Sequence, residues 1–313
     1  MLRTVLAKPW IWSFLAAVAA WLATLAVSGG QGGGQILTAA FSFSAFTVLV
    51  SLGQMLVITT GPGNVDLSIP SVIALSSAVS MLVMNEDPAM IVPGLLAAVL
   101  AGLAVGACNF GLIRLLRIPP IIATLSSSLV VMSIAIVNGR GLKIKPPQLF
   151  SDLVTAKLFG VPLLAAVALI AAVLVALALE RTVYGRSVGA VGQNDRAAQL
   201  AGFDVERTRF ITYALSGGLA GLTGALIAGF SGGNSLDQGE EYLLLTIAVV
   251  VIGGTSVAGG RASVPGVWGA ALFMFLVVTM LNAAGADPGV RLLLTGLIII
   301  AVITLAGGEK TIR

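Results

Sequence analysis

The chain contains no histidine and only one cysteine, Cys108, in 313 residues. Without histidine, no side chain of ordinary pKa changes its charge near neutral pH, and a lone cysteine forms neither an intrachain disulfide nor a thiolate metal site. The sequence also lacks a G-x-x-x-x-G-K-[ST] phosphate loop, a metal-ligand cluster and a nucleophile–base pair. These absences argue against an enzyme, and they predict no metal and no cofactor in this chain.

Charge is scarce as well. Charged residues make up 10% of the chain, hydrophobic residues 58%, and the mean hydropathy is +1.05. A soluble protein of this length does not have such a composition. The net charge is +4, but the basic residues are dispersed between apolar runs and form no patch with aromatic residues. The chain is therefore predicted to lie in membrane lipid and to bind no nucleic acid.

Apolar runs of membrane-spanning length recur along the whole chain. We predict an all-α multi-pass membrane protein with about ten transmembrane helices, each near the roughly 20 residues that cross the hydrocarbon layer. The first run, residues 10–27, is long for a signal peptide and lacks a convincing cleavage site, so we expect an uncleaved span. Most of the 17 lysines and arginines then fall on the side of the N-terminus, which predicts that both termini are cytoplasmic.

Two polar stretches rich in glycine and proline interrupt this pattern, near residues 61–70 and 253–265. Broken or re-entrant segments are expected there, because unwound backbone is tolerated at membrane depth where protein buries it or where it lines a polar path. For the second stretch, a tight turn between two spans is an equal alternative. Residues 66–72 and 261–267 are also similar to each other, as a weak parallel repeat, by chance, or through shared turn chemistry. The candidates for a solute path or gate are Asn64, Asp66, Ser68, Gly253, Gly254 and Thr255.

Asp66 borders two apolar spans and has no cation near it in sequence. An ionisable residue at membrane depth is a functional candidate, so the carboxylate is one option for the solute path or a gate. The other option is a helix cap, since aspartate accepts hydrogen bonds from the first free N–H groups of a helix. We favour the cap.

Small residues follow helical spacing in two other spans. Gly102 and Gly106 share one face, and Gly217, Gly221 and Gly224 share another. Such faces let helices approach closely in lipid, so we predict a structural role for them.

The longest polar interruption covers residues 180–209. Its core is predicted to be one short surface helix with small residues on a single face, and Gly202 is placed to end that helix. A face of small side chains can lie deep in a groove. The segment is either an ordinary basic cytoplasmic loop or a docking helix for a cytoplasmic motor. The face consists of Ala190, Asn194, Ala197, Ala198 and Ala201.

Residues 185–205 resemble the coupling segment of ABC importer permeases of the ribose and monosaccharide type, which follows the pattern G-R-x-x-x-A-x-G-x-N-x-x-A-A-x-x-x-G-x-x-V. So many matches at fixed spacing make the resemblance specific. It implies that the matching residues couple the permease to its ATPase. These residues are Gly185, Arg186, Ala190, Gly192, Asn194, Ala197, Ala198 and Gly202, followed by Val205.

The resemblance extends from about residue 51 onward and is strongest over 183–269. Pro70 stands where the family usually has glycine, and Ala262 and Pro265 alter the second glycine-rich element. Leu243 and Leu245 replace the acidic positions of a Y-E-L-D run, so no substrate role is transferred to them.

The resemblance implies one permease domain over residues 1–313, with the coupling loop at 180–209, in the cytoplasmic (inner) membrane of a bacterium. It implies import of a monosaccharide or similar small polar solute. Its partners would be a second permease subunit, identical or different, cytoplasmic ATPase subunits that hold ATP and Mg²⁺, and a periplasmic solute-binding protein. The distribution of lysines and arginines places the polar loops 139–160 and 231–241 outside, so we predict that they contact this binding protein. The alternatives are a permease for nucleosides or branched-chain amino acids, an ion-coupled secondary transporter, or a structural scaffold.

Overall fold

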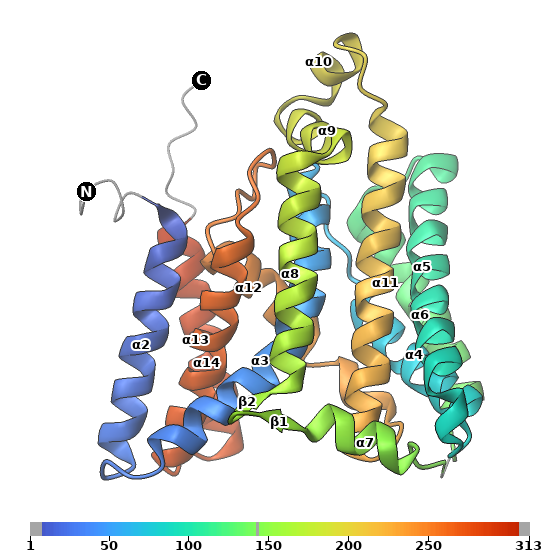
Figure 1. The fold of residues 1–313 in the computed structure, drawn as a ribbon. Helices are drawn as coiled ribbons and strands as arrows, with labels where there is room; N and C mark the ends of the chain where they lie inside the picture. The colour runs from blue at the N-terminus through green and yellow to red at the C-terminus, as the bar shows by residue number, and fades with distance from the viewer. Residues whose placement is uncertain (1–7, 142–143, 307–313) are drawn as a thin grey trace.

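The computed structural model describes residues 8–141 and 144–306, and they are predominantly helical (Figure 1). The predicted all-α membrane architecture is confirmed. The longer helices are α2 (Pro9–Val27), α3 (Gly33–Thr59), α5 (Ile91–Leu116), α6 (Pro120–Gly139), α8 (Leu163–Arg181), α11 (Val205–Ser231), α13 (Val264–Ala283) and α14 (Pro288–Ala306). The shorter elements are α4 (Ile69–Met84), η1 (Pro88–Met90), α7 (Gln148–Thr155), α9 (Val183–Gln193), α10 (Asp195–Leu200), η2 (Leu236–Gly239), α12 (Tyr242–Ile252) and the antiparallel pair β1 (Lys157–Leu158) and β2 (Val161–Pro162).

Seven helices of the described residues are long and apolar enough to cross a membrane. Two of the predicted spans are shorter than expected. Helix α4 has 16 residues and α12 has only 11, so α12 extends about 16 Å along its axis, roughly half of the hydrocarbon thickness. Both short helices adjoin a break, because residues 60–68 and 253–263 are non-helical. The breaks therefore lie where the glycine and proline residues predicted them.

Helix α3 forms the centre of the bundle. Every residue from Ser44 to Thr59 is buried, which explains why this stretch shows no single apolar face. Side chains of α4, α8, α11, α12 and α13 pack with it into one large apolar core.

The two predicted faces of small residues pack against each other, between α5 and α11. A methyl group added to Gly102 would collide with the carbonyl of Gly217, and one added to Gly106 would collide with the carbonyl of Tyr213. The absence of side chains thus lets the two backbones touch, and the structural role predicted for these glycines is confirmed.

The helices α9 and α10 lie at one end of the bundle, which we call the α10 end, and α7 with the β1–β2 pair lies at the other, the α7 end (Figure 1). The first residues of α2 and the last of α14 are at the α10 end. Residues 139–141, 144–160 and 231–241 lie at the α7 end (Figure 1), where Asn234 Nδ2 donates to the Gly139 carbonyl at 3.4 Å. The prediction of membrane sidedness also used four lysines and arginines that lie outside the described residues: Arg3, Lys143, Lys310 and Arg313.

The similarity between residues 66–72 and 261–267 corresponds to two helix starts of the same kind. Helices α4 and α13 each follow a serine, Ser68 and Ser263, and each carries a proline in the first turn. Proline is favoured there because a backbone N–H in the first turn has no partner within the helix. The two similar segments therefore hold the same kind of helix start.

Candidate functional site

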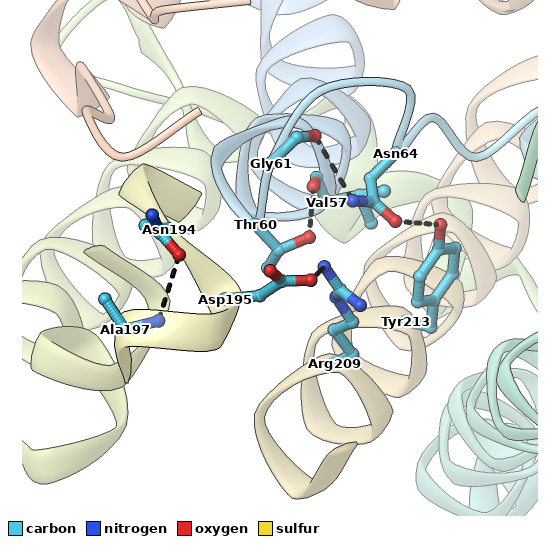
Figure 2. A network of polar contacts seen from close by, with 9 residues as sticks. All are labelled: Val57, Thr60, Gly61, Asn64, Asn194, Asp195, Ala197, Arg209 and Tyr213. Carbon is cyan, nitrogen blue, oxygen red and sulfur yellow. Dashed lines mark hydrogen bonds and ion pairs between the residues drawn. The ribbon is translucent and has the colours of Figure 1, made fainter. Parts of the chain in front are cut away.

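The coupling segment forms two helices, not the single helix predicted. The backbone turns at Asn194, whose φ and ψ are −163° and 107°, and its side-chain oxygen accepts a hydrogen bond from the Ala197 N–H at 2.9 Å (Figure 2). Asparagine is a preferred N-cap because it satisfies an otherwise unpaired N–H group. The prediction was wrong because the run of small residues was extended through a residue that starts a new helix.

The predicted small-residue face is divided by this break. Ala198 is buried, with 3% of its surface exposed, whereas Ala197 and Ala201 are exposed and Ala190 is half-buried. Leu200 beside them is 85% exposed. The helix α10 therefore projects from the bundle and presents an apolar side chain together with small ones.

The end of α10 confirms the predicted role of Gly202. Its φ of +87° lies in the left-handed region, which glycine enters without steric cost. The Gly202 N–H donates to the Gln199 carbonyl and the Phe203 N–H donates to the Ala198 carbonyl, both at 3.0 Å. This pair of bonds is the Schellman arrangement that satisfies the last carbonyls of a helix.

Helix α9 is fixed firmly at its start. The Thr182 side chain caps it by accepting from the Gly185 N–H at 3.2 Å, and a methyl group on Gly185 would collide with the backbone of Leu179 at the end of α8. The Tyr184 hydroxyl lies 2.9 Å from the Thr212 hydroxyl of α11. Burial raises the pKa of Tyr184 to about 12, so this phenol stays neutral at physiological pH. Arg186 is exposed to solvent.

The end of α9 lies against the end of α3 and against the second break. The Gly260 N–H donates to the carbonyl of Thr59, the last residue of α3, at 2.9 Å. A methyl group on Gly192 would collide with both the Thr59 carbonyl and the Gly260 backbone. One on Gly259 would lie 2.6 Å from the Gly192 oxygen and 2.6 Å from the Gly61 Cα. We call the meeting of Gly61, Gly192, Gly259 and Gly260 the glycine junction.

The first break begins with a turn held by Asn64. Its Nδ2 donates to the Gly61 carbonyl at 3.2 Å, and its Oδ1 accepts from the Tyr213 hydroxyl of α11 at 3.3 Å. Figure 2 shows this side chain between the turn and α11. Asn64 is buried, so both hydrogen bonds are shielded from water.

Asp66 does not cap α4 as predicted. The residue at the N-cap of α4 is Ser68, which makes no side-chain cap bond. Asp66 Oδ1 instead accepts from the Ser68 N–H at 3.0 Å and from the Ser68 hydroxyl at 2.6 Å, which closes an Asx-type turn before the helix. Asp66 Oδ2 accepts from the Ser216 hydroxyl of α11 at 2.8 Å.

The hydrogen bonds around Asp66 continue across the subunit. The Ser68 hydroxyl accepts from Asn109 Nδ2 of α5 at 2.7 Å, and the Ser127 hydroxyl of α6 donates to Asn109 Oδ1. The Asp66 N–H donates to Gln54 Oε1 of α3 at 3.1 Å. Sequence reasoning missed these partners. The available signal was a lone amide side chain within an apolar run, Gln54 in α3 and Asn109 in α5. In lipid such an amide must find a partner on another helix.

The second break begins where α12 ends. Gly254 has a φ of +85°, and its N–H donates to the Val251 carbonyl while the Thr255 N–H donates to the Val250 carbonyl. Thr255 is buried and its hydroxyl accepts from the Ser263 N–H at 3.2 Å. Gly253 lies against the backbone of Gly266 in α13.

A groove of about 1070 Å³ separates α8 from α2 and α13. Its walls are mostly apolar, with Leu169, Phe14 and Trp268 among the lining side chains, and its lining also includes Gly185 and Gly260. The six residues predicted for a solute path do not line it. They lie in the two breaks, where the polar side chains among them bond to protein groups.

Comparison with known proteins adds an independent finding. Residues 35–303 match the family described as "Branched-chain amino acid transport system / permease component". The chain is 31% identical over 269 residues to the ribose import permease protein RbsC of Bacillus subtilis, covering 83% of this chain and 81% of that protein. It is 31% identical over 290 residues to the fructose import permease protein FrcC of Rhizobium meliloti, covering 84% and 78%.

A third relative is the autoinducer 2 import system permease protein LsrC of Enterobacter sp. It is 30% identical over 307 residues, which cover 98% of this chain and 89% of that protein. No solved structure matches the chain.

Proposed function

Since the chain belongs to the family of branched-chain amino acid transport system permease components, we propose that it is the membrane-spanning permease subunit of an ATP-driven ABC importer for a monosaccharide or similar small polar solute. Import permeases for ribose and fructose are among its relatives. The coupling pattern over residues 185–205 supports the same assignment. Two other solutes are the alternatives within this function: a branched-chain amino acid, which the family description names, and a nucleoside.

One observation carries the proposal: the α9–α10 segment both projects from the bundle and contacts the end of α3 and the second break. Leu200 is 85% exposed at the tip, where a soluble partner can reach it. At its other end Gly192 lies against the Thr59 carbonyl, just before the first break, and against the Gly260 backbone in the second break. An element through which a motor moves a membrane domain needs these two properties together, a free docking surface and a stiff connection to the parts that move.

The roles of the predicted coupling residues follow from their places. Gly185 and Gly192 permit the close backbone contacts of α9, and Asn194 and Gly202 begin and end α10. Arg186 and Ala197 are exposed and available to the ATPase, whereas Ala198 is buried and Ala190 is half-buried in α9.

The α10 end is assigned to the cytoplasm and the α7 end to the periplasm, with both termini inside. Counting α4 and α12, the chain then passes the bilayer about ten times. Loops 139–160 and 231–241 would face the periplasm and contact the solute-binding protein. Since the sequence has no phosphate loop, ATP and Mg²⁺ would be held by separate ATPase subunits, which act on this chain and on a second permease subunit.

The residues predicted for a solute path are assigned a different role. The side chains of Asn64, Asp66 and Ser68 bond to α5, α11 and neighbouring backbone inside one subunit. They hold the first break in place between those helices. Gly253, Gly254 and Thr255 shape the end of α12. The breaks are therefore positioned by these residues, and we do not assign the solute to them.

Co-purification and uptake test the proposal. The chain extracted from its own membranes in mild detergent should retain ATP-binding subunits. Proteoliposomes that contain this complex and the binding protein should take up ribose or fructose when ATP is supplied inside, and adenosine and leucine serve as probes for the alternatives. A chain that carries no ATPase and transports with an ion gradient would be a secondary transporter, and the proposal would be wrong.

A further inference from the structure

Helix α10 is held to the rest of the protein by few side chains. It has six residues, and Ala198 is the one buried side chain among them. Both of its ends are turns, at Asn194 and at Gly202. The glycine junction fixes α9, but it lies before the turn at Asn194. The junction alone therefore leaves the orientation of α10 relative to the bundle undetermined.

One ion pair links α10 directly to α11. Arg209 Nη2 of α11 lies 3.4 Å from Asp195 Oδ2, the first residue of α10 (Figure 2). The arginine side chain is largely covered, with 28% of its surface exposed, and the aspartate is 56% exposed. A carboxylate is favoured at the first residue of a helix because the helix dipole is positive there. The pair thus ties the start of α10 to α11.

Arg209 belongs to a row of polar side chains on one face of α11. Arg209, Tyr213 and Ser216 lie at i, i+4 and i+7, which is a single helical face. Each contacts a different residue: Arg209 contacts Asp195, Tyr213 contacts Asn64, and Ser216 contacts Asp66. We call these three residues the polar stripe of α11. The stripe connects the projecting helix to two points of the first break.

We propose that the Asp195–Arg209 ion pair is the tie that makes α10 move together with α11 and the first break, so that it sets how much solute is moved for each ATP hydrolysed. Asp195 and Arg209 are positioning residues in this proposal. The inference rests on the proposed function, because it presumes an ATPase docked on α10.

The geometry of the Asp195–Arg209 pair allows it to tighten when the ATPase pushes on α10. The contact joins one nitrogen and one oxygen at 3.4 Å, and Arg209 Nε is buried without a hydrogen-bond partner in the part of the chain that the structure describes. An arginine–carboxylate pair is strongest when two parallel N–H···O bonds form. A push that brings α10 toward α11 allows the second bond to form, and the load then passes into α11.

The test measures two quantities separately: the amount of solute taken up per ATP hydrolysed, and the assembly of the complex. Asp195→Asn, Arg209→Gln and the double variant are each purified with the ATPase subunits and reconstituted with the binding protein, at equal amounts of assembled complex. Uptake of the probe sugar that the unchanged complex transports, ribose or fructose, is divided by ATP hydrolysed. We expect both single variants to assemble normally and their ratio to fall by about two- to fivefold, the range expected for one part-exposed ion pair. The double variant should be no worse than the poorer single variant, because the tie is lost only once.

Arg207→Gln is the matched control, since Arg207 lies on the same helix, is exposed, and forms no ion pair among the described residues. Its ratio should equal that of the unchanged protein. An unchanged ratio in both single variants, or losses that add in the double variant, would overturn the tie while leaving the proposed function intact. If the protein without substitutions binds no ATPase, both the proposed tie and the proposed function would be wrong.

Discussion

The Ser216 hydroxyl donates a 2.8 Å hydrogen bond to Asp66 Oδ2, although the two residues are 150 positions apart in the chain. Ser216 lies within the long helix α11, and Asp66 lies in the non-helical segment before α4. A buried carboxylate must be surrounded by donors, because burying a polar group without partners costs free energy. This bond therefore fixes where the first break runs relative to α11.

Replacing Asp66 should separate the carboxylate's hydrogen bonds from its charge. Asp66→Asn keeps an acceptor for the two Ser68 bonds and offers an amide to the Ser216 hydroxyl, so we expect folding and transport to remain. Asp66→Ala leaves the Ser68 and Ser216 donors unpaired and should lower the free energy of unfolding by about 1–3 kcal/mol. Thermal melting in detergent and uptake in vesicles measure the two effects. An asparagine variant that folds normally but does not transport would show that the charge itself takes part in transport.

The glycine junction can be tested with a pair of matched substitutions. Gly192→Ala places a methyl group against the Thr59 carbonyl and the Gly260 backbone, whereas Gly189→Ala places one 3.8 Å from the Gly260 oxygen, an ordinary contact. We expect Gly192→Ala to destabilise the protein by about 1–3 kcal/mol or to uncouple transport, since the backbones must separate. Gly189→Ala should behave as the unchanged protein. Equal melting temperatures and uptake for both variants would contradict the junction.

The two neighbouring alanines of α10 should respond differently to a large side chain. Ala198 is buried and Ala197 is exposed. Ala198→Trp should displace α10 and lower stability, because an indole does not fit a buried alanine site. Ala197→Trp should leave the melting temperature unchanged and weaken only the docking of the ATPase. Retention of ATPase subunits on a column of the immobilised variant measures this, and full retention by Ala197→Trp would remove that residue from the docking surface.

The sidedness of the membrane protein is testable with cysteine labelling. In a Cys108→Ser background, a cysteine at Leu149 of α7 should react with a membrane-impermeant thiol reagent added to cells with a permeable outer membrane. A cysteine at Leu200 of α10 should react only after the inner membrane is opened. Both side chains are exposed, at 51% and 85%, so a difference in labelling reports sidedness. The reverse order would place the α10 end in the periplasm.

Several local features were predictable because nearby residues decide them. The apolar runs determined most helices, the glycine and proline residues determined where the two breaks fall, and Gly202 ended α10 through its left-handed backbone. The break at Asn194 was also local in origin. It was missed because the spacing of the alanines favoured one continuous helix, while the side chain of Asn194 provided a cap for a second one.

The sequence by itself thus determined the class of the protein, its helices and the segment that resembles a coupling element, since composition and short-range spacing control these. Only the tertiary structure decided which polar groups meet. Three contacts depend on how each helix is rotated and packed. Asp66 bonds to Ser216 instead of capping α4, Asp195 pairs with Arg209, and Gly192 touches Gly259. In an apolar chain with few polar side chains, many pairings are compatible with the sequence. The close approach of the helices selects one set, because a buried polar group can pair only with the groups that the packing brings within reach.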